Sequence, residues 1–201
     1  MADYRFLVDG RPGDPIVVLR SRFWNFNSIG LYHGEQAAVI DPGIYPDEIQ
    51  TLNGAICTRN LPAGGRRRVS DVVLTHSHHD HIRGWTHFPG ARITAPRVVA
   101  EKSETARKRI LARKFQIDEK LGIEDADFTY PEVDVVFDDT TRLRVGGLDT
   151  EVRFLPGHSN CTSVVHLPQL GTLCTADYLV SPGLPYCRWE AHAFELSLIH
   201  I

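Results

Sequence analysis

The chain has 201 residues and a formal net charge of −3, and 42% of its residues are hydrophobic. This length and composition suit one globular domain with a sizeable core, so we expect residues 1–201 to form a single domain. The mild negative charge gives no reason to expect nucleic acid as a partner, and no apolar run is long enough to span a bilayer. Because the N-terminus lacks a secretory signal and the four cysteines form no C-x-x-C pair, we expect a cytoplasmic protein.

The first fifty residues predict strands followed by a helix. Apolar and β-branched runs predict strands at 16–19, 27–32 and 36–40, the last two joined by a turn at His33. The aromatic segment 23–27 fits a cluster at the edge of the core, or else a pocket wall. Proline and two acidic residues begin a helix near residue 46, since these residue types suit the first turn.

A cluster of four histidines and one aspartate follows the apolar run 71–74. Side chains two residues apart in an extended chain point the same way, so His76 and His78 can meet one ion. Asp80 and His81 lie where the pattern becomes helical, and they project towards a different place. Since His and Asp are ligands of first-row metals, the spacing indicates two neighbouring metal sites rather than a polar loop.

The remaining chain alternates between helical and strand patterns. The helix that starts at residue 79 contains Gly84, which allows close approach to its neighbours. A single long helix is expected at 96–121, ending at Gly122. The strands predicted downstream of the cluster are 92–95, and then 133–137, 141–145, 151–155, 163–167 and 172–175, the last five in one sheet.

Two basic segments have open interpretations. The helix at 96–121 carries Arg109, Arg113 and several lysines. This basic side is either a solvated face or a surface that favours an acidic substrate. The arginine run 66–68 is expected to be solvated.

The motif His76-x-His78-x-Asp80-His81 resembles the H-x-H-x-D-H signature of the metallo-β-lactamase superfamily. Matches at 39–43, 156–158 and 176–177 follow in the expected order, so the resemblance covers about residues 27–177. It implies an α/β fold, the four-layer αββα sandwich. Two positions depart from the family's pattern. Asn160-Cys161 replaces the family's Pro-Gly, so the loop after His158 is expected to differ in shape. Ala176 replaces the family's Gly before Asp177.

The family's final metal-binding histidine has no clear counterpart. His192 and His200 are the only candidates, and neither has the right context. We therefore expect the C-terminal section of the domain to be lacking, with loop 179–188 lining part of a pocket.

The resemblance also implies a division of ligands. His76, His78 and His158 would hold one ion, and Asp80, His81 and Asp177 the other, with Asp177 able to bridge both. The cofactor would be zinc, two ions per complete domain, with iron or manganese as alternatives. Asp80 is the expected catalytic residue, because it can orient the water or take its proton. Asp41 would support the site from behind.

This chemistry indicates a hydrolase in which a zinc-bound hydroxide attacks a small ester, thioester or lactone. Asp177 stands where lactam-cleaving relatives often have Cys, so antibiotic hydrolysis is not the first choice. The alternatives are a phosphodiesterase or nuclease, an iron-dependent oxidoreductase and an inactive metal-binding fragment. A nuclease is favoured if the basic helix and residues 66–68 line the cleft. The expected partner is a small-molecule substrate.

Overall fold

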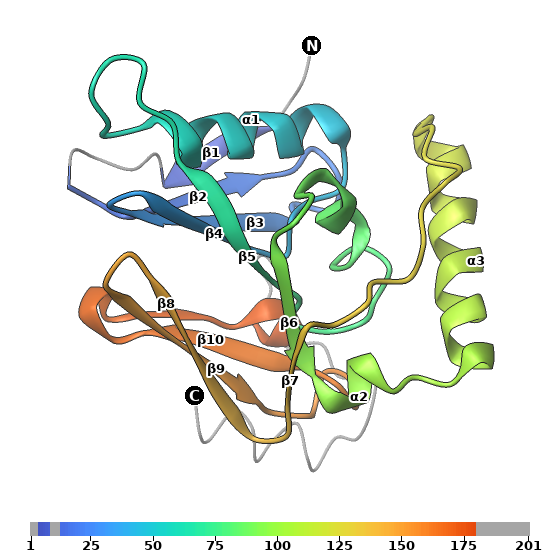
Figure 1. The fold of residues 1–201 in the computed structure, drawn as a ribbon. Helices are drawn as coiled ribbons and strands as arrows, with labels where there is room; N and C mark the ends of the chain where they lie inside the picture. Colours follow the sequence, from blue (N-terminus) through green and yellow to red (C-terminus); the bar gives the residue numbers. More distant parts are fainter. Residues whose placement is uncertain (1–3, 9–12, 180–201) are drawn as a thin grey trace.

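The computed structural model describes residues 4–8 and 13–179 (Figure 1). Loop 180–188, His192 and His200 lie outside the described residues. The elements, in chain order, are β1 (Arg5–Val8), β2 (Ile16–Arg20), β3 (Asn27–His33), β4 (Gln36–Ile40), α1 (Pro46–Thr58), β5 (Arg68–Val73), the 3₁₀ helix η1 (Arg83–His87), β6 (Arg92–Pro96), α2 (Arg97–Ala100), α3 (Glu104–Leu121), β7 (Val135–Phe137), β8 (Thr140–Val145), β9 (Leu148–Phe154), β10 (Ser163–Leu167), η2 (Pro168–Leu170), β11 (Thr172–Cys174) and η3 (Ala176–Tyr178).

Two sheets form the frame of the molecule. The first has strand order β1-β2-β3-β4-β5-β6-β7, and the second has β11-β10-β9-β8. Strands β1 to β4 pair antiparallel, as short turns allow, whereas β4, β5, β6 and β7 pair in parallel. Parallel neighbours require a crossover, and the helical segments α1, η1 and α2–α3 make these connections. The parallel strands therefore send their carboxyl ends to one edge of the sheet.

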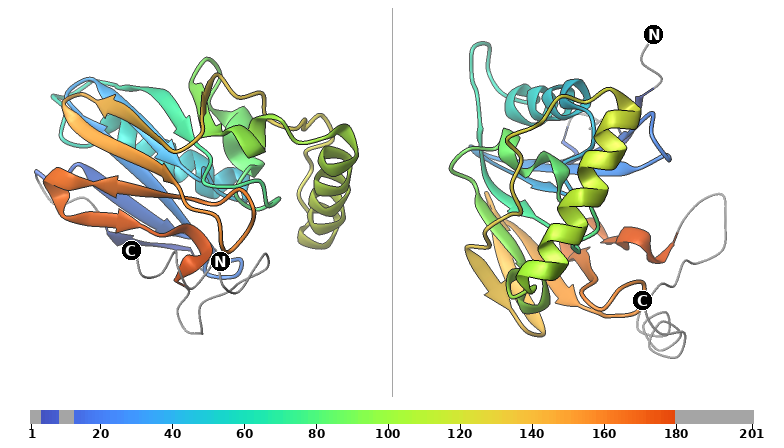
Figure 2. Two further views of the ribbon diagram at one scale, coloured as in Figure 1. Left: turned by 90° about the horizontal axis from the view of Figure 1, so that it is seen from below. Right: turned by 90° about the vertical axis from the view of Figure 1, so that its right-hand side faces the viewer.

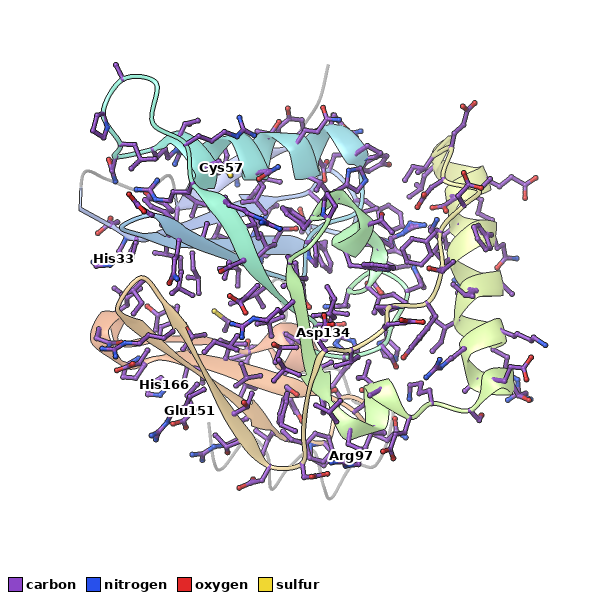
Figure 3. The ribbon with its side chains drawn as sticks, in the orientation of Figure 1. His33, Cys57, Arg97, Asp134, Glu151 and His166 are labelled. Atoms are coloured by element: carbon purple, nitrogen blue, oxygen red, sulfur yellow. The ribbon has the colours of Figure 1, made fainter. Side chains whose placement is uncertain are left out.

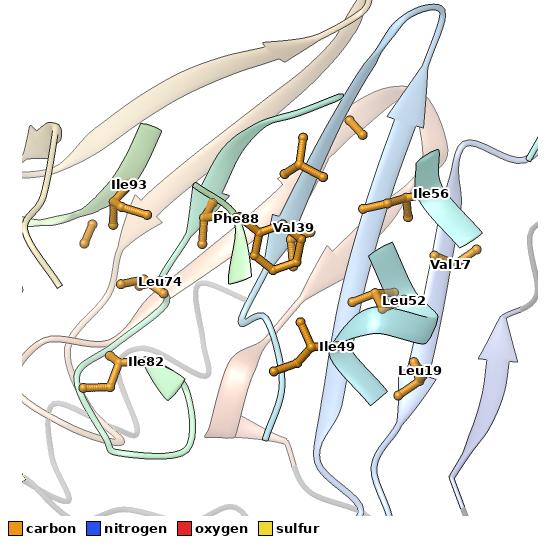
Figure 4. Close-up of a cluster of buried hydrophobic side chains, with 14 of the residues drawn as sticks. Val17, Leu19, Val39, Ile49, Leu52, Ile56, Leu74, Ile82, Phe88 and Ile93 are labelled. Carbon is orange, nitrogen blue, oxygen red and sulfur yellow. The ribbon is translucent and has the colours of Figure 1, made fainter. Parts of the chain in front are cut away.

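Two apolar cores hold the layers together. Helix α1 places Ile49, Leu52 and Ile56 on the outer face of the first sheet (Figure 4). Gly30 on β3 makes this approach possible, because a Cβ there would lie 2.3 Å from Ile56 Cγ2. The second core lies between the sheets, where residues of β3, β4 and β5 meet residues of β8, β9 and β10, including Val152. The predicted α/β fold with stacked sheets is confirmed.

The outer face of the second sheet is polar in the described part of the chain. His166 and Glu151 pair across β10 and β9 and project from this face (Figure 3). Within residues 13–179 no α-helix covers it. The three layers described are α1, the first sheet and the second sheet, and a fourth helical layer is not among them.

Three expectations about the elements were wrong. Residues 79–82 form a turn, in which the His81 N–H donates to the His78 carbonyl, and a 3₁₀ helix follows at Arg83–His87. The long helix is split into α2 and α3, because Ser103 caps α3 with its side chain and so begins a new helix. Strand β7 belongs to the first sheet, since the α2–α3 crossover brings it parallel to β6. The pattern also missed β1, the partner of β2.

Two other local predictions, at Gly84 and at the arginine run 66–68, had different outcomes. A Cβ on Gly84 would lie 2.7 Å from Pro42 Cβ, so this glycine does allow a close approach. The arginine run divides: Arg66 and Arg68 are exposed, but Arg67 is buried and donates to the Gly34 and Ile56 carbonyls. The expectation that the whole run is solvated is therefore wrong for Arg67.

Candidate metal centre

The predicted metal ligands come from loops that follow three strands. His76 and His78 follow β5, His158 follows β9 and Asp177 follows β11. Two hydrogen bonds join these loops: the Ser163 N–H donates to the Thr75 carbonyl at 2.8 Å, and the Ser77 hydroxyl lies 3.2 Å from the Cys161 thiol. The chain thus brings together at one rim residues that are about a hundred positions apart.

The first group of donor atoms consists of His76, His78, His158 and Asp177, whose ligand atoms all lie within 4.8 Å of one another. His76 Nε2 is 2.9 Å from His78 Nδ1, and His158 Nε2 is 3.1 Å from the same atom. The Asp177 carboxylate is 3.3 Å from His158 Nε2 and 3.9 Å from His76 Nε2. Three imidazole nitrogens and one carboxylate oxygen therefore face a common point.

The second group is Asp80, His81 and Asp177. His81 Nε2 lies 3.1 Å from one Asp177 oxygen and 3.8 Å from Asp80. Since Asp177 belongs to both groups, its two oxygens can serve two adjacent ions. The structure brings together all six side chains that were predicted as ligands, and their metal binding stays a prediction.

Asp41 lies behind both groups and holds them in place. Its carboxylate accepts hydrogen bonds from the Thr75 N–H at 2.9 Å, the Thr75 hydroxyl at 2.7 Å and His81 Nδ1 at 2.8 Å. Because the Thr75 hydrogen goes to Asp41, the hydroxyl oxygen, 3.1 Å from His76 Nδ1, can accept that ring's N–H. His76 and His81 are thereby oriented with Nε2 toward the donor groups, because their Nδ1 atoms are held by Thr75 and Asp41. Thr75 was not singled out, although it directly precedes the motif.

Asp41 has a left-handed backbone, with φ of +48°. This conformation turns the chain sharply after β4, so the carboxylate points back at the end of β5 rather than along the sheet. Asp and Asn tolerate left-handed φ better than most residues, which suits Asp to this position.

Burial and charge divide the histidines. His76 and His158 are fully buried. Burial lowers the pKa of His76 well below its usual value, and it lowers the pKa of His78 to about 4. Burial acts in the same direction on His81, but the carboxylates of Asp177, Asp41 and Asp80 outweigh it and raise the pKa of His81 well above its usual value. His76 and His78 are thus neutral at pH 7, whereas a cation binding at His81 must displace a proton.

The donor set fits divalent zinc. Two nitrogen ligands about 2.05 Å from a tetrahedral ion are about 3.4 Å apart, close to the observed spacings among His76, His78 and His158. Imidazole nitrogens and carboxylate oxygens are ligands of zinc and also of other divalent metals. The Nδ1 positions of His76 and His81 are already occupied by Thr75 and Asp41. The residues present therefore fit two ions that share Asp177.

A cleft of about 680 Å³ opens over both groups. Its lining includes Trp24 and Phe26 from the loop before β3, Ile110 from α3 and Leu173 from β11. Phe26 is buried with its ring 4.9 Å from His81, whereas Trp24 is 63% exposed. The aromatic segment 23–27 thus serves both interpretations, since it packs against the site and also walls the pocket.

Charged residues also border the cleft. Arg109 and Arg113 of α3 line it, but residues 66–68 do not. Arg20 on β2 lines it as well, and its buried Nε has no hydrogen-bond partner among the described residues. The sequence identified the basic helix but could not tell which of its cations would face the cleft.

These features define a protein with a cluster of His and Asp side chains, able to bind metal ions, at the edge of stacked sheets. A profile of the Metallo-beta-lactamase superfamily matches residues 22–197, and the chain belongs to that family. A curated relative, the hydroxyacylglutathione hydrolase of Pseudomonas savastanoi pv. phaseolicola, is 30% identical over 125 residues, which cover 62% of this chain. The chain spans about a third of that relative's length, 35%.

Solved structures show the same fold at low sequence identity. The B3 metallo-beta-lactamase BLEG-1 has a TM-score of 0.64 and 18% identity, covering 92% of this chain and 83% of its own. A metallo-beta-lactamase family protein from Thermus thermophilus has a TM-score of 0.59 and 20% identity, covering 98% of this chain and 68% of its own.

Among the described helices, none combines the length and the apolar character needed to cross a membrane.

Proposed function

We propose that this protein is a metal-dependent hydrolase of small esters, thioesters or lactones. One observation carries the proposal: two adjacent groups of nitrogen and oxygen donors share Asp177 at the floor of an open cleft. The name of the Pseudomonas relative, a hydrolase of hydroxyacylglutathione, supports an acylated thiol as the substrate class. We propose zinc as the metal, because neutral imidazoles dominate the first group.

Zinc bound at these groups would supply Lewis acidity to the scissile carbonyl and would lower the pKa of a bound water to about 7. Asp80 then has the catalytic role: its carboxylate, with a side chain 15% exposed, can accept a proton from the attacking water and orient it. Asp177 fixes the distance between the two groups. His81, held by Asp41, keeps a constant orientation during this transfer. Phe26 and Trp24 limit the access of solvent from one side.

A phosphodiesterase is the second candidate, because Arg109 and Arg113 line the cleft. Residues 66–68 do not line it, which weighs against a nucleic acid as the substrate. We place the protein in the cytoplasm, a proposal supported by the free thiols of Cys57, Cys161 and Cys174.

The test is hydrolysis of a thioester, an ester, a lactone and a phosphodiester by zinc-loaded protein. We expect turnover of the carbonyl substrates and at least a roughly 100-fold loss in His76→Ala, since one ligand of the first group is removed. His166→Ala is the matched control, because that histidine is exposed on β10 away from the cleft. Turnover of the phosphodiester alone would favour the second candidate, and equal rates in His76→Ala and the wild type would refute both.

A further inference from the structure

Helix α3 stands beside the two sheets (Figure 2), and Arg109, Ile110 and Arg113 of this helix line the cleft. We propose that Arg109 and Arg113 form an anion-binding subsite that takes a carboxylate of the substrate. This inference rests on the proposed hydrolase function and specifies its substrate: a small thioester or ester with a carboxylate on the arm that extends toward α3.

The spacing of the two arginines places them on one face of the helix. Residues four apart in an α-helix are neighbours, and two like charges at this spacing repel each other. Both side chains are exposed, and both line the cleft together with Ile110, which lies between them in the sequence. The pair therefore does not stabilise the helix, and it places two positive charges at the cleft.

Neither arginine has an acidic partner in the described part of the chain. Arg113 donates to the neutral amide of Gln116 at 2.7 Å, and Arg109 has no hydrogen-bond or ion-pair partner within residues 13–179. Other cations of the same helix are paired: Lys108 with Glu104 at 2.5 Å, and Lys114 with Asp118 at 2.7 Å. Among the cations of α3 that have no acidic partner within residues 13–179, Arg109 and Arg113 are the two that line the cleft.

The subsite adjoins the metal centre. Arg113 and His79 both line the cleft that opens over the candidate metal centre. His79 directly precedes Asp80, and its ring lies 6.3 Å from that of Trp24. A substrate whose carbonyl lies at Asp80 and Asp177 would therefore extend past His79 and Trp24 to reach the arginines.

The helix that carries the arginines is anchored to the motif. Arg83, two residues after His81, pairs with Asp118, and it also donates to the Lys114 carbonyl at 3.1 Å. Lys114 is buried and pairs with Asp125 at 2.6 Å. These contacts hold α3 in place beside the metal centre, so the helix carries both arginines at the border of the cleft. The planar, permanently charged guanidinium binds a carboxylate through paired hydrogen bonds, which favours this anion over a neutral group.

The test compares two substrates that differ only in charge: the acetyl thioester of mercaptopropionate and that of mercaptopropionamide. We expect the zinc-loaded protein to prefer the acid by about tenfold in kcat/KM, and the Arg109→Gln, Arg113→Gln double variant to lose this preference. The loss should come from KM with kcat nearly unchanged, because the subsite binds the ground state and the transition state alike. Lys108→Gln, on the same helix, should keep the preference.

A binding measurement separates this proposal from the proposed function. Calorimetric titration with the ethyl thioethers of the same acid and amide requires no turnover. Tighter binding of the acid, weakened in the double variant and by added salt, supports the subsite even if neither thioester is hydrolysed. Equal binding of acid and amide to the wild type would overturn it, and so would a double variant that retains the preference.

Discussion

The most direct test of the support for the metal centre is Asp41→Asn. Asparagine has the same shape and also tolerates the left-handed φ of +48°, so the backbone should remain as it is. The amide oxygen can still accept the Thr75 N–H, but the amide nitrogen would face two donors, the Thr75 hydroxyl and His81 Nδ1. His81 would then lose the partner that fixes its ring.

We expect the affinity for the second ion to fall by between about 10-fold and 100-fold, the effect usual for loss of such a partner, or about 1.4 to 2.7 kcal/mol. The first ion should be affected less, because Asp41 makes no hydrogen bond to His78 or His158. Zinc titration against a chromophoric chelator resolves the two binding steps. Asp138→Asn is the control, since Asp138 is exposed and pairs with Arg97 outside the cleft. Unchanged affinity in both steps would refute the reasoning, and so would an equal loss in both.

Three further predictions concern stability. Removing zinc with a chelator should lower the free energy of unfolding. The loss is about 2.7 kcal/mol for each site if the free zinc concentration was about 100 times Kd before the chelator was added. Thermal unfolding that is unaffected by the chelator would contradict metal binding. Burial lowers the pKa of His79 from 6.5 to about 4, so below pH 6.5 the unfolded chain takes up a proton that the folded protein does not, and stability falls as the pH falls. Between pH 7 and 5 His79 contributes about 2 kcal/mol to this loss. In urea unfolding of the metal-free protein, the total loss should therefore be smaller by about 2 kcal/mol in His79→Gln, where the contribution of His78 remains. It should be unchanged in His166→Gln. Ala176→Gly should stabilise the folded protein by about 0.5 to 1 kcal/mol. The reason is that Ala176 has a left-handed φ of +49°, which costs an L-residue about 1–2 kcal/mol. A lower free energy of unfolding for the variant in the same urea measurement would contradict this.

The ligands themselves could be predicted from the sequence, because their chemistry is local. Alternating spacing aims His76 and His78 the same way, and a turn after them aims Asp80 and His81 elsewhere. His158 and Asp177 follow predicted strands, but their assignment as metal ligands came from the resemblance to the family's motifs. The structure brings these side chains into two adjacent groups, and the metal binding of each group stays a prediction.

Tertiary structure decided what depends on contacts between distant segments. Whether β7 joins the first or the second sheet is set by the crossover that precedes it, and its own apolar pattern suits either sheet. Arg67 and Arg109 look alike in the sequence, yet Arg67 is buried against backbone carbonyls and Arg109 lines the cleft. Residue type and spacing determine which atoms can bind a metal, but only the packing of helices on sheets determines which charges surround it.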